Sequence, residues 1–163
     1  MELLEAYRLE LQSLVLVGLA MLLGAVIGFE REIEDKPAGL RTHMLVAGAA
    51  ALLVSVGDVV VRRFSVDLGR EVVRSDPMRI IEAVITGVSF LGAGTIIRHR
   101  GRRRIEGLTT AAATLFTAGV GVCVALSQVL LALGGTVLVL GTLRGVGMLQ
   151  HRIERAADPT HTQ

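Results

Sequence analysis

Large aromatic side chains are scarce in this sequence, which has no Trp, one Tyr and four Phe in 163 residues. A soluble core of this size would therefore lack most of its usual large fillers. Hydrophobic residues nevertheless make up 52% of the chain, against roughly 45–50% in soluble proteins, and the mean hydropathy is +0.60. Abundant Gly and Ala suit helices that pack closely inside a bilayer. The composition predicts an all-α polytopic membrane protein.

Cysteine and the common catalytic motifs are also missing or nearly so. The single Cys123 lies in an apolar run and cannot form an intramolecular disulfide, so we expect a packing residue. The sequence has no Walker loop, nucleophile elbow, HExxH or paired-cysteine metal motif, and its four histidines lack ligand spacing. These absences predict a protein that is not an enzyme and has no resident cofactor. The arginines flank apolar segments, which argues against nucleic acid as a partner.

Five apolar segments approach the length of about 20 residues that a membrane-spanning helix needs. They cover residues 11–29, 44–61, 80–97, 108–126 and 129–149. Only Ser127 and Gln128 separate the last two, which predicts a tight helical hairpin, with a single bent helix and four spans as the alternative. We therefore expect one transmembrane domain over residues 1–155, followed by a disordered tail over residues 156–163. Residues 60–74 have the spacing of an amphipathic surface helix.

The distribution of basic residues predicts the orientation in the membrane. Of the 17 Lys and Arg residues, 11 fall on the side that holds the first and third loops and the C-terminus, and six on the other. Because cytoplasmic segments carry the excess of positive charge, the N-terminus is predicted outside and the C-terminus in the cytoplasm. Glu2, Glu5 and Glu10 give the N-terminus the wrong charge for a cleavable signal, so the first helix would direct insertion.

Charged residues crowd the segment between the first two apolar runs. They are Glu30, Arg31, Glu32, Glu34, Asp35, Lys36 and Arg41. Carboxylates at a membrane surface could hold Mg²⁺, which prefers a few acidic oxygens and retained waters. The alternative is a network of ion pairs that fixes the helix ends. The turn expected at Pro37-Ala38-Gly39 would bring Arg41 back toward Glu30 and pair the two.

Two further acids, Asp58 and Glu82, lie near the outer ends of the second and third apolar segments. Ionisable residues inside membranes are functional candidates, so these two could form an acidic entry for a cation. Equally, each could be an interfacial residue that reaches water, with Glu82 directed toward Arg79.

Glycine and threonine supply the remaining candidates. The third apolar segment contains Gly87, Gly92 and Gly94, and the same small-residue theme recurs at 24/28 and 141/145. Close helix packing is the simpler interpretation, and a passage lined by backbone carbonyls is the alternative. Thr109 and Thr110 follow a basic run at 98–104 whose arginines we expect to meet anionic lipid head groups.

Taken together and in order, these segments resemble the MgtC/SapB family of bacterial inner-membrane proteins. The matching pieces are GFEREIEDKPAGLRTHMLV (28–46), DPMRI (76–80), GVSFLGAGTIIR (87–98) and GLTTAAATLFTAGVGV (107–122), within a resemblance that runs from about residue 12 to about residue 148. The resemblance implies a five-helix membrane domain, here without the soluble C-terminal domain of the best-known members. The family motif positions are Glu30, Arg31, Arg41, Thr42, Gly87, Gly92, Ala93, Gly94, Gly107, Leu108, Thr109 and Thr110.

The resemblance also implies a function. The family is associated with growth at low magnesium and with survival of pathogens inside macrophages, so we expect a role in magnesium homeostasis, including Mg²⁺ transport. Under that hypothesis Mg²⁺ is substrate or ligand, Glu82 and Asp58 form an outer site, and Glu30 and Glu32 an inner one. The alternative is a regulator that does not transport and that binds other membrane proteins such as ATP synthase or transport ATPases. The partners expected are the lipid bilayer and either a second copy or another membrane protein.

Overall fold

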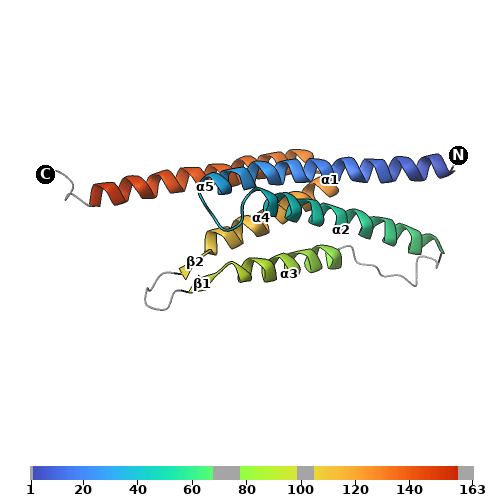
Figure 1. The fold of residues 1–163 in the computed structure, drawn as a ribbon. Coiled ribbons are helices and arrows are strands. Elements are labelled where there is room, and N and C mark those ends of the chain that lie inside the picture. Colours follow the sequence, from blue (N-terminus) through green and yellow to red (C-terminus); the bar gives the residue numbers. More distant parts are fainter. Residues whose placement is uncertain (1, 68–77, 99–104, 158–163) are drawn as a thin grey trace.

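The computed structural model describes residues 2–67, 78–98 and 105–157, and these fold almost entirely as helix. The elements in chain order are α1 (Glu2–Ile33), α2 (Leu40–Asp67), α3 (Met78–Gly94), β1 (Ile97–Arg98), β2 (Ile105–Glu106), α4 (Leu108–Ala125) and α5 (Val129–Ala157). The two short strands pair antiparallel (Figure 1). The structure confirms the all-α polytopic class.

Several helices have the dimensions of membrane spans. Within the described residues, the stretches Tyr7–Ile33, Leu40–Val61 and Leu108–Ala125 are long and apolar enough to cross a membrane, and Val129–Gly145 is a shorter apolar helix. α3 has 17 residues, which corresponds to about 25 Å of helix. Large side chains such as Phe90 and Leu130 are exposed on the outer surface, as expected for side chains that meet lipid.

The boundaries of the elements differ from the sequence prediction in three places. α3 ends at Gly94, and Ile97 enters a strand rather than the helix expected over 80–97. α2 continues without a break to Asp67, so residues 60–67 extend it and do not start a separate amphipathic helix, while residues 68–77 lie outside the described part. α5 continues through Ala157. The disordered tail was predicted over residues 156–163; its first two residues belong to α5, and residues 158–163 lie outside the described part.

The hairpin predicted between the last two helices is confirmed. Ser127 adopts a left-handed backbone with φ 59°, and its neighbour Gln128 donates its amide to the carbonyl of Cys123 at 2.8 Å. These features close α4 with a turn before α5 begins, which excludes the single bent helix. The start of α1 and the end of α5 lie at opposite ends of the molecule (Figure 1). The number of spans stays a prediction. Which end faces the cytoplasm stays a prediction.

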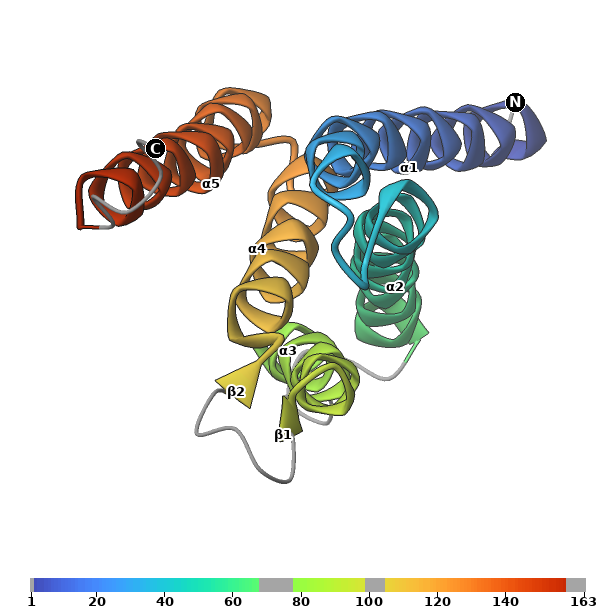
Figure 2. The same ribbon diagram turned by 60° about the vertical axis from the view of Figure 1, so that its left-hand side comes forward.

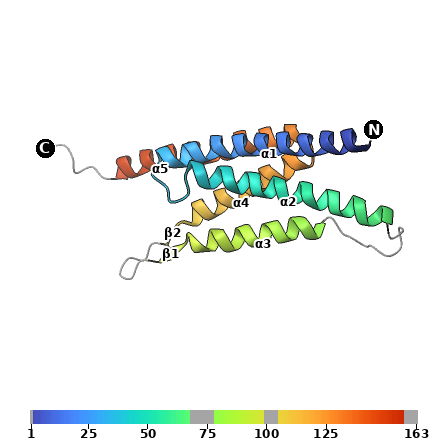
Figure 3. The same ribbon diagram turned by 45° about the vertical axis from the view of Figure 1, so that its right-hand side comes forward.

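α4 is the central helix of the bundle. It contacts each of the other four helices, and Figure 2 shows it between α1 and α2 on one side and α5 on the other. α3 lies at an edge of the molecule, alongside α2 and α4 (Figure 3).

Two clusters of buried apolar residues fill the contacts between the helices. One includes Ala20, Ile27, Ala47, Val124 and Ala132, and the other includes Val46, Ala50, Val84, Ala118 and Val122. Small side chains dominate both, which explains how helices with few aromatics can pack so closely.

Candidate functional site

The turn between α1 and α2 places the polar residues of the site. Asp35 has φ 53°, and the Lys36 amide donates to the Arg31 carbonyl at 3.0 Å, which ends α1 with a left-handed residue. The carboxylate of Glu32 then accepts a hydrogen bond from the Leu40 amide at 2.7 Å. A free amide in the first turn of α2 is thereby satisfied by a side chain from the end of α1. Glu32 therefore links the C-terminal end of α1 to the N-terminal end of α2 by a hydrogen bond.

Glycines on α1 let α2 approach close enough to enter the site. A Cβ on Gly28 would lie 2.7 Å from Leu40 Cα and 2.9 Å from the Cβ of His43. One turn earlier, a Cβ on Gly24 would lie 2.5 Å from the His43 carbonyl oxygen. The predicted close packing at the Gly24/Gly28 pair is therefore present, and its consequence is to bury the first turn of α2 against α1.

Glu30 and Arg31 form a buried ion pair at the end of α1. Their residues are 3% and 4% exposed, and Arg31 Nη1 lies 3.7 Å from Glu30 Oε2. Arg41, which the turn was expected to return toward Glu30, is exposed instead. The expected pairing of Glu30 with Arg41 was wrong, because the partner comes from the adjacent position of the same helix. Glu30 Oε2 and Arg31 Nε have no hydrogen-bond partner within the described part of the chain.

His43 is the buried neighbour that sequence reasoning missed. It is 0% exposed, and its Nδ1 lies 3.0 Å from the carbonyl oxygen of Gly39. Its other ring nitrogen, Nε2, has no hydrogen-bond partner among residues 2–67, 78–98 and 105–157. The sequence contained one signal: His43 stands next to Thr42 in the charged segment, at the start of an apolar helix, where a polar ring is unusual.

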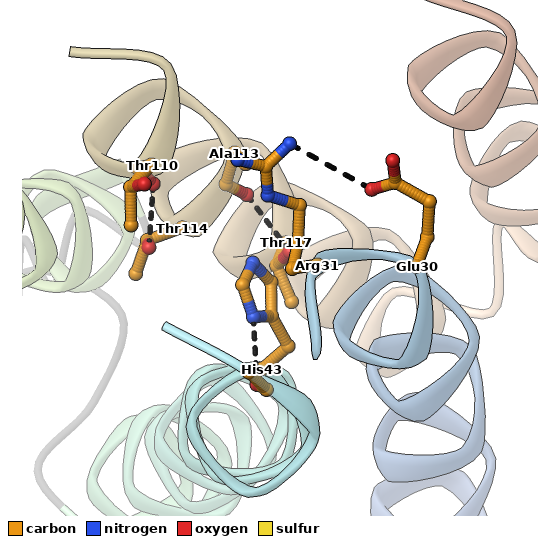
Figure 4. Close-up of polar contacts among 8 residues, drawn as sticks. Glu30, Arg31, His43, Thr110, Ala113, Thr114 and Thr117 are labelled. Atoms are coloured by element: carbon orange, nitrogen blue, oxygen red, sulfur yellow. Dashed lines mark hydrogen bonds and ion pairs between the residues drawn. The ribbon is translucent and has the colours of Figure 1, made fainter. Parts of the chain in front are cut away.

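Threonines of α4 complete the polar cluster. Thr110, Thr114 and Thr117 are all buried, and they recur at the spacing that places side chains on one helix face. The Thr114 hydroxyl donates to the Thr110 carbonyl and the Thr117 hydroxyl to the Ala113 carbonyl, both at 2.8 Å. Figure 4 shows Arg31 and His43 pointing toward this face of α4, with Glu30 beyond the guanidinium. Thr110 belongs to the predicted set, whereas Thr117 was not selected from the sequence.

The other motif residues have diverse positions. Gly107 precedes α4 with φ +92°, and a Cβ there would collide with the Thr95 carbonyl, so glycine is required. Gly92 is buried with Ala111 against it. A Cβ on Gly87 or Gly94 would meet nothing within 4 Å, so the close packing predicted there does not occur against the residues that the structure describes. Thr42 is half-buried and Thr109 is exposed.

The predicted outer acids lie away from the buried cluster. Asp58 and Glu82 are both exposed, on α2 and α3 respectively. Asp58 helps to line a pocket of about 400 Å³ together with Gln12, Ser13 and Ser55, near the turn between α4 and α5. Among the described residues, no group of three or more His, Cys, Asp or Glu side chains is placed to hold a metal ion. The Mg²⁺ ligands suggested from the sequence stay a prediction.

Comparison with known proteins adds the family context. The chain matches the family model described as "MgtC family" over residues 17–152. It is 40% identical to Protein SrpB of Synechococcus elongatus in an alignment of 146 residues that covers 81% of this chain and 73% of that protein. It is 37% identical to YhiD of Escherichia coli K12, named as a candidate magnesium transporter, over 83% of this chain and 60% of YhiD. Protein MgtC of Salmonella typhimurium LT2 is 39% identical over 74% of this chain and 46% of its own length.

The chain therefore spans between about half and three quarters of the length of these relatives. No solved structure matches it significantly.

Proposed function

This chain belongs to the MgtC family, and from that premise we propose that it is a multi-pass protein of the bacterial inner membrane that acts in magnesium homeostasis. The name of YhiD supports the link to magnesium. The predominance of basic residues on one side of the predicted spans supports the inner-membrane location, with the turn between α1 and α2 and the C-terminus on the cytoplasmic side.

Within that role, we propose that the protein regulates other membrane proteins by contact and does not itself carry Mg²⁺. One observation carries this choice: the buried carboxylate of Glu30 is already paired with the Arg31 guanidinium, 3.7 Å away. Mg²⁺ needs acidic oxygens that are free to replace part of its hydration shell. A divalent cation at Glu30 would be repelled by Arg31 and would leave that buried guanidinium without its counter-charge, which is costly.

The outer surface supports contact with another membrane helix. Among the described residues, nothing lies within 4 Å of where a Cβ would stand on Gly87 and Gly94 of α3 or on Gly141 and Gly145 of α5. Small residues on a lipid-facing surface permit a neighbouring backbone to approach closely. The resemblance described above suggests ATP synthase or a transport ATPase as such a neighbour, and a second copy of this chain would use the same surface.

Mg²⁺ transport is the second candidate. The pocket beside Asp58 favours it, since an acidic residue at the expected outer end could admit a hydrated cation. In this mechanism Asp58 would be essential for Mg²⁺ flux. The Glu30 carboxylate would have to break its ion pair with Arg31 in order to bind Mg²⁺.

Reconstitution in liposomes distinguishes the two. Purified wild-type protein, Glu30→Gln and Asp58→Asn would be compared with protein-free liposomes by an enclosed magnesium dye, with circular dichroism to show that each variant is folded. An ionophore added at the end verifies the dye in every sample. We expect Mg²⁺ entry equal to that of protein-free liposomes for all three proteins. If the wild-type protein admits Mg²⁺ into the liposomes and either Asp58→Asn or Glu30→Gln abolishes this entry, the regulator hypothesis is rejected and Mg²⁺ transport is established.

Growth at low magnesium tests the contact surface. In a strain that lacks the chromosomal gene, Gly141→Leu would fill the open surface of α5, and we expect it to abolish rescue of growth. Leu138→Met on the same helix, also at an exposed position, keeps a large apolar side chain and should rescue fully. Full rescue by Gly141→Leu at equal membrane abundance would contradict a role for this part of the surface.

A further inference from the structure

The hydrogen bond from His43 to Gly39 fixes which ring nitrogen carries the proton. A carbonyl oxygen only accepts, so the Nδ1 that lies 3.0 Å from it must be the donor. In the neutral ring this leaves Nε2 as an acceptor with its lone pair unused. His43 is fully buried, and Nε2 has no hydrogen-bond partner in the part of the chain that the structure describes. The ring therefore presents a buried acceptor toward α4.

A donor and a second acceptor face the same space. Arg31 is 4% exposed, and its Nε–H is a donor without a partner among the described residues. The Thr117 hydroxyl gives its hydrogen to the Ala113 carbonyl at 2.8 Å, so its oxygen retains the capacity to accept. Figure 4 shows the three side chains converging from α1, α2 and α4. Glu30 lies on the opposite side of the guanidinium and does not share this space.

We propose that this space is a binding site for one water molecule, held between Arg31, His43 and Thr117. The water accepts from Arg31 Nε–H and donates one hydrogen to His43 Nε2 and the other to the Thr117 oxygen. Arg31 Nε and His43 Nε2 then each have a partner, and the water makes three hydrogen bonds, the usual number for a buried water.

The set of one donor and two acceptors selects against ions. A bare cation would satisfy the acceptors but leave Arg31 Nε–H facing a positive charge, and a bare anion would leave the lone pair of His43 facing a negative one. Water both donates and accepts, so it fits where Mg²⁺ and chloride do not. The site lies among the family motif residues, and it would keep this part of the bundle hydrated without providing a place for the transported ion.

Solid-state NMR of the full chain in phospholipid bilayers, with ¹⁵N-labelled histidine, tests the site. The chain has four histidines, so His43→Gln identifies the His43 signals by their loss. At neutral pH we expect a neutral ring with a protonated Nδ1 and an unprotonated Nε2, and magnetisation transfer from water protons to that ring. Removing the hydroxyl with Thr117→Val should shift the Nε2 resonance and reduce the transfer.

Thr114→Val is the matched control. Thr114 is also buried on α4 and also donates its hydroxyl to the carbonyl four residues earlier, but Figure 4 shows it turned toward Thr110. It should leave the His43 signals in place. The proposal would be overturned by a proton on Nε2, by no transfer from water in the wild type, or by equal effects of the two valine variants. A shift of the Nε2 resonance on adding MgCl₂ would also overturn it, in favour of a cation.

Discussion

Gly121 on α4 lies against the backbone carbonyl of Ala47 on α2, with no room for a side chain between them. The contact sets the distance between the central helix and α2. The contact also lies among the apolar residues that α1, α2 and α4 contribute to the core. A larger side chain at Gly121 would therefore push apart the helices that enclose Arg31, His43 and the α4 threonines.

Gly121→Ala should therefore destabilise the bundle by about 1–3 kcal/mol, the usual cost of inserting an extra methyl group into a filled core. The measurement is reversible unfolding in detergent, followed by circular dichroism. Gly119→Ala on the same helix is the control, because a Cβ there would meet nothing within 4 Å. Equal stability of the two variants would mean that α2 and α4 are farther apart than the structure shows.

Gly107→Ala should weaken the connection between α3 and α4. The residue has φ +92°, and its Cβ would collide with the Thr95 carbonyl. A non-glycine residue in this backbone conformation costs about 1–3 kcal/mol even without the collision. We expect faster hydrogen exchange in the first turn of α4 and lower stability. Gly94→Ala, at a position in open space, should change neither, and a neutral Gly107→Ala would contradict the left-handed conformation.

Glu32→Ala should loosen the turn between α1 and α2. The Leu40 amide would lose its acceptor at 2.7 Å, and loss of a side chain that caps a helix start costs about 1 kcal/mol. Exchange of the Leu40 amide, measured by NMR in micelles, should become faster. Glu32→Gln keeps an acceptor oxygen and should have a smaller effect, whereas Glu34→Ala removes a nearby exposed acid and should have none. Slow exchange at Leu40 in Glu32→Ala would be inconsistent with this cap.

A double-mutant cycle tests the pair between Glu30 and Arg31. Glu30→Gln or Arg31→Gln alone leaves an uncompensated buried charge, which costs about 3–5 kcal/mol of unfolding free energy. The double variant should be more stable than the sum of the single effects predicts, with a coupling of about 0.5–3 kcal/mol. Additive effects would show that the two charges do not interact in the folded protein.

Much of the fold followed from the sequence because its signals are local. Apolar stretches separated by charged or turn-forming residues determine where helices can exist, and the Ser127-Gln128 pair was enough to predict the final hairpin. Charged residues were less informative about helix ends. α1 begins well before its apolar stretch, and α2 runs on to Asp67, because a polar residue outside the membrane can continue a helix that has already formed.

The candidate site was predicted only in part. Glu30 and Glu32 looked equivalent in the sequence. Two positions along a helix correspond to a rotation of about 200° about its axis, so the two side chains point to nearly opposite sides of the helix. One is buried beside Arg31 and the other reaches out to the Leu40 amide. Which of them faces inward depends on where α2 and α4 pack, and no local pattern contains that information.

The sequence by itself determined the class of this protein, the approximate place of its helices and its family, since these depend on composition, length and motif order. Only the tertiary structure decided that His43, Arg31 and Thr117 meet. They come from three helices, and their burial depends on the close approach that Gly24, Gly28 and Gly121 allow. A glycine marks a possible contact in the sequence, but the partner on the other side is fixed only when the helices pack.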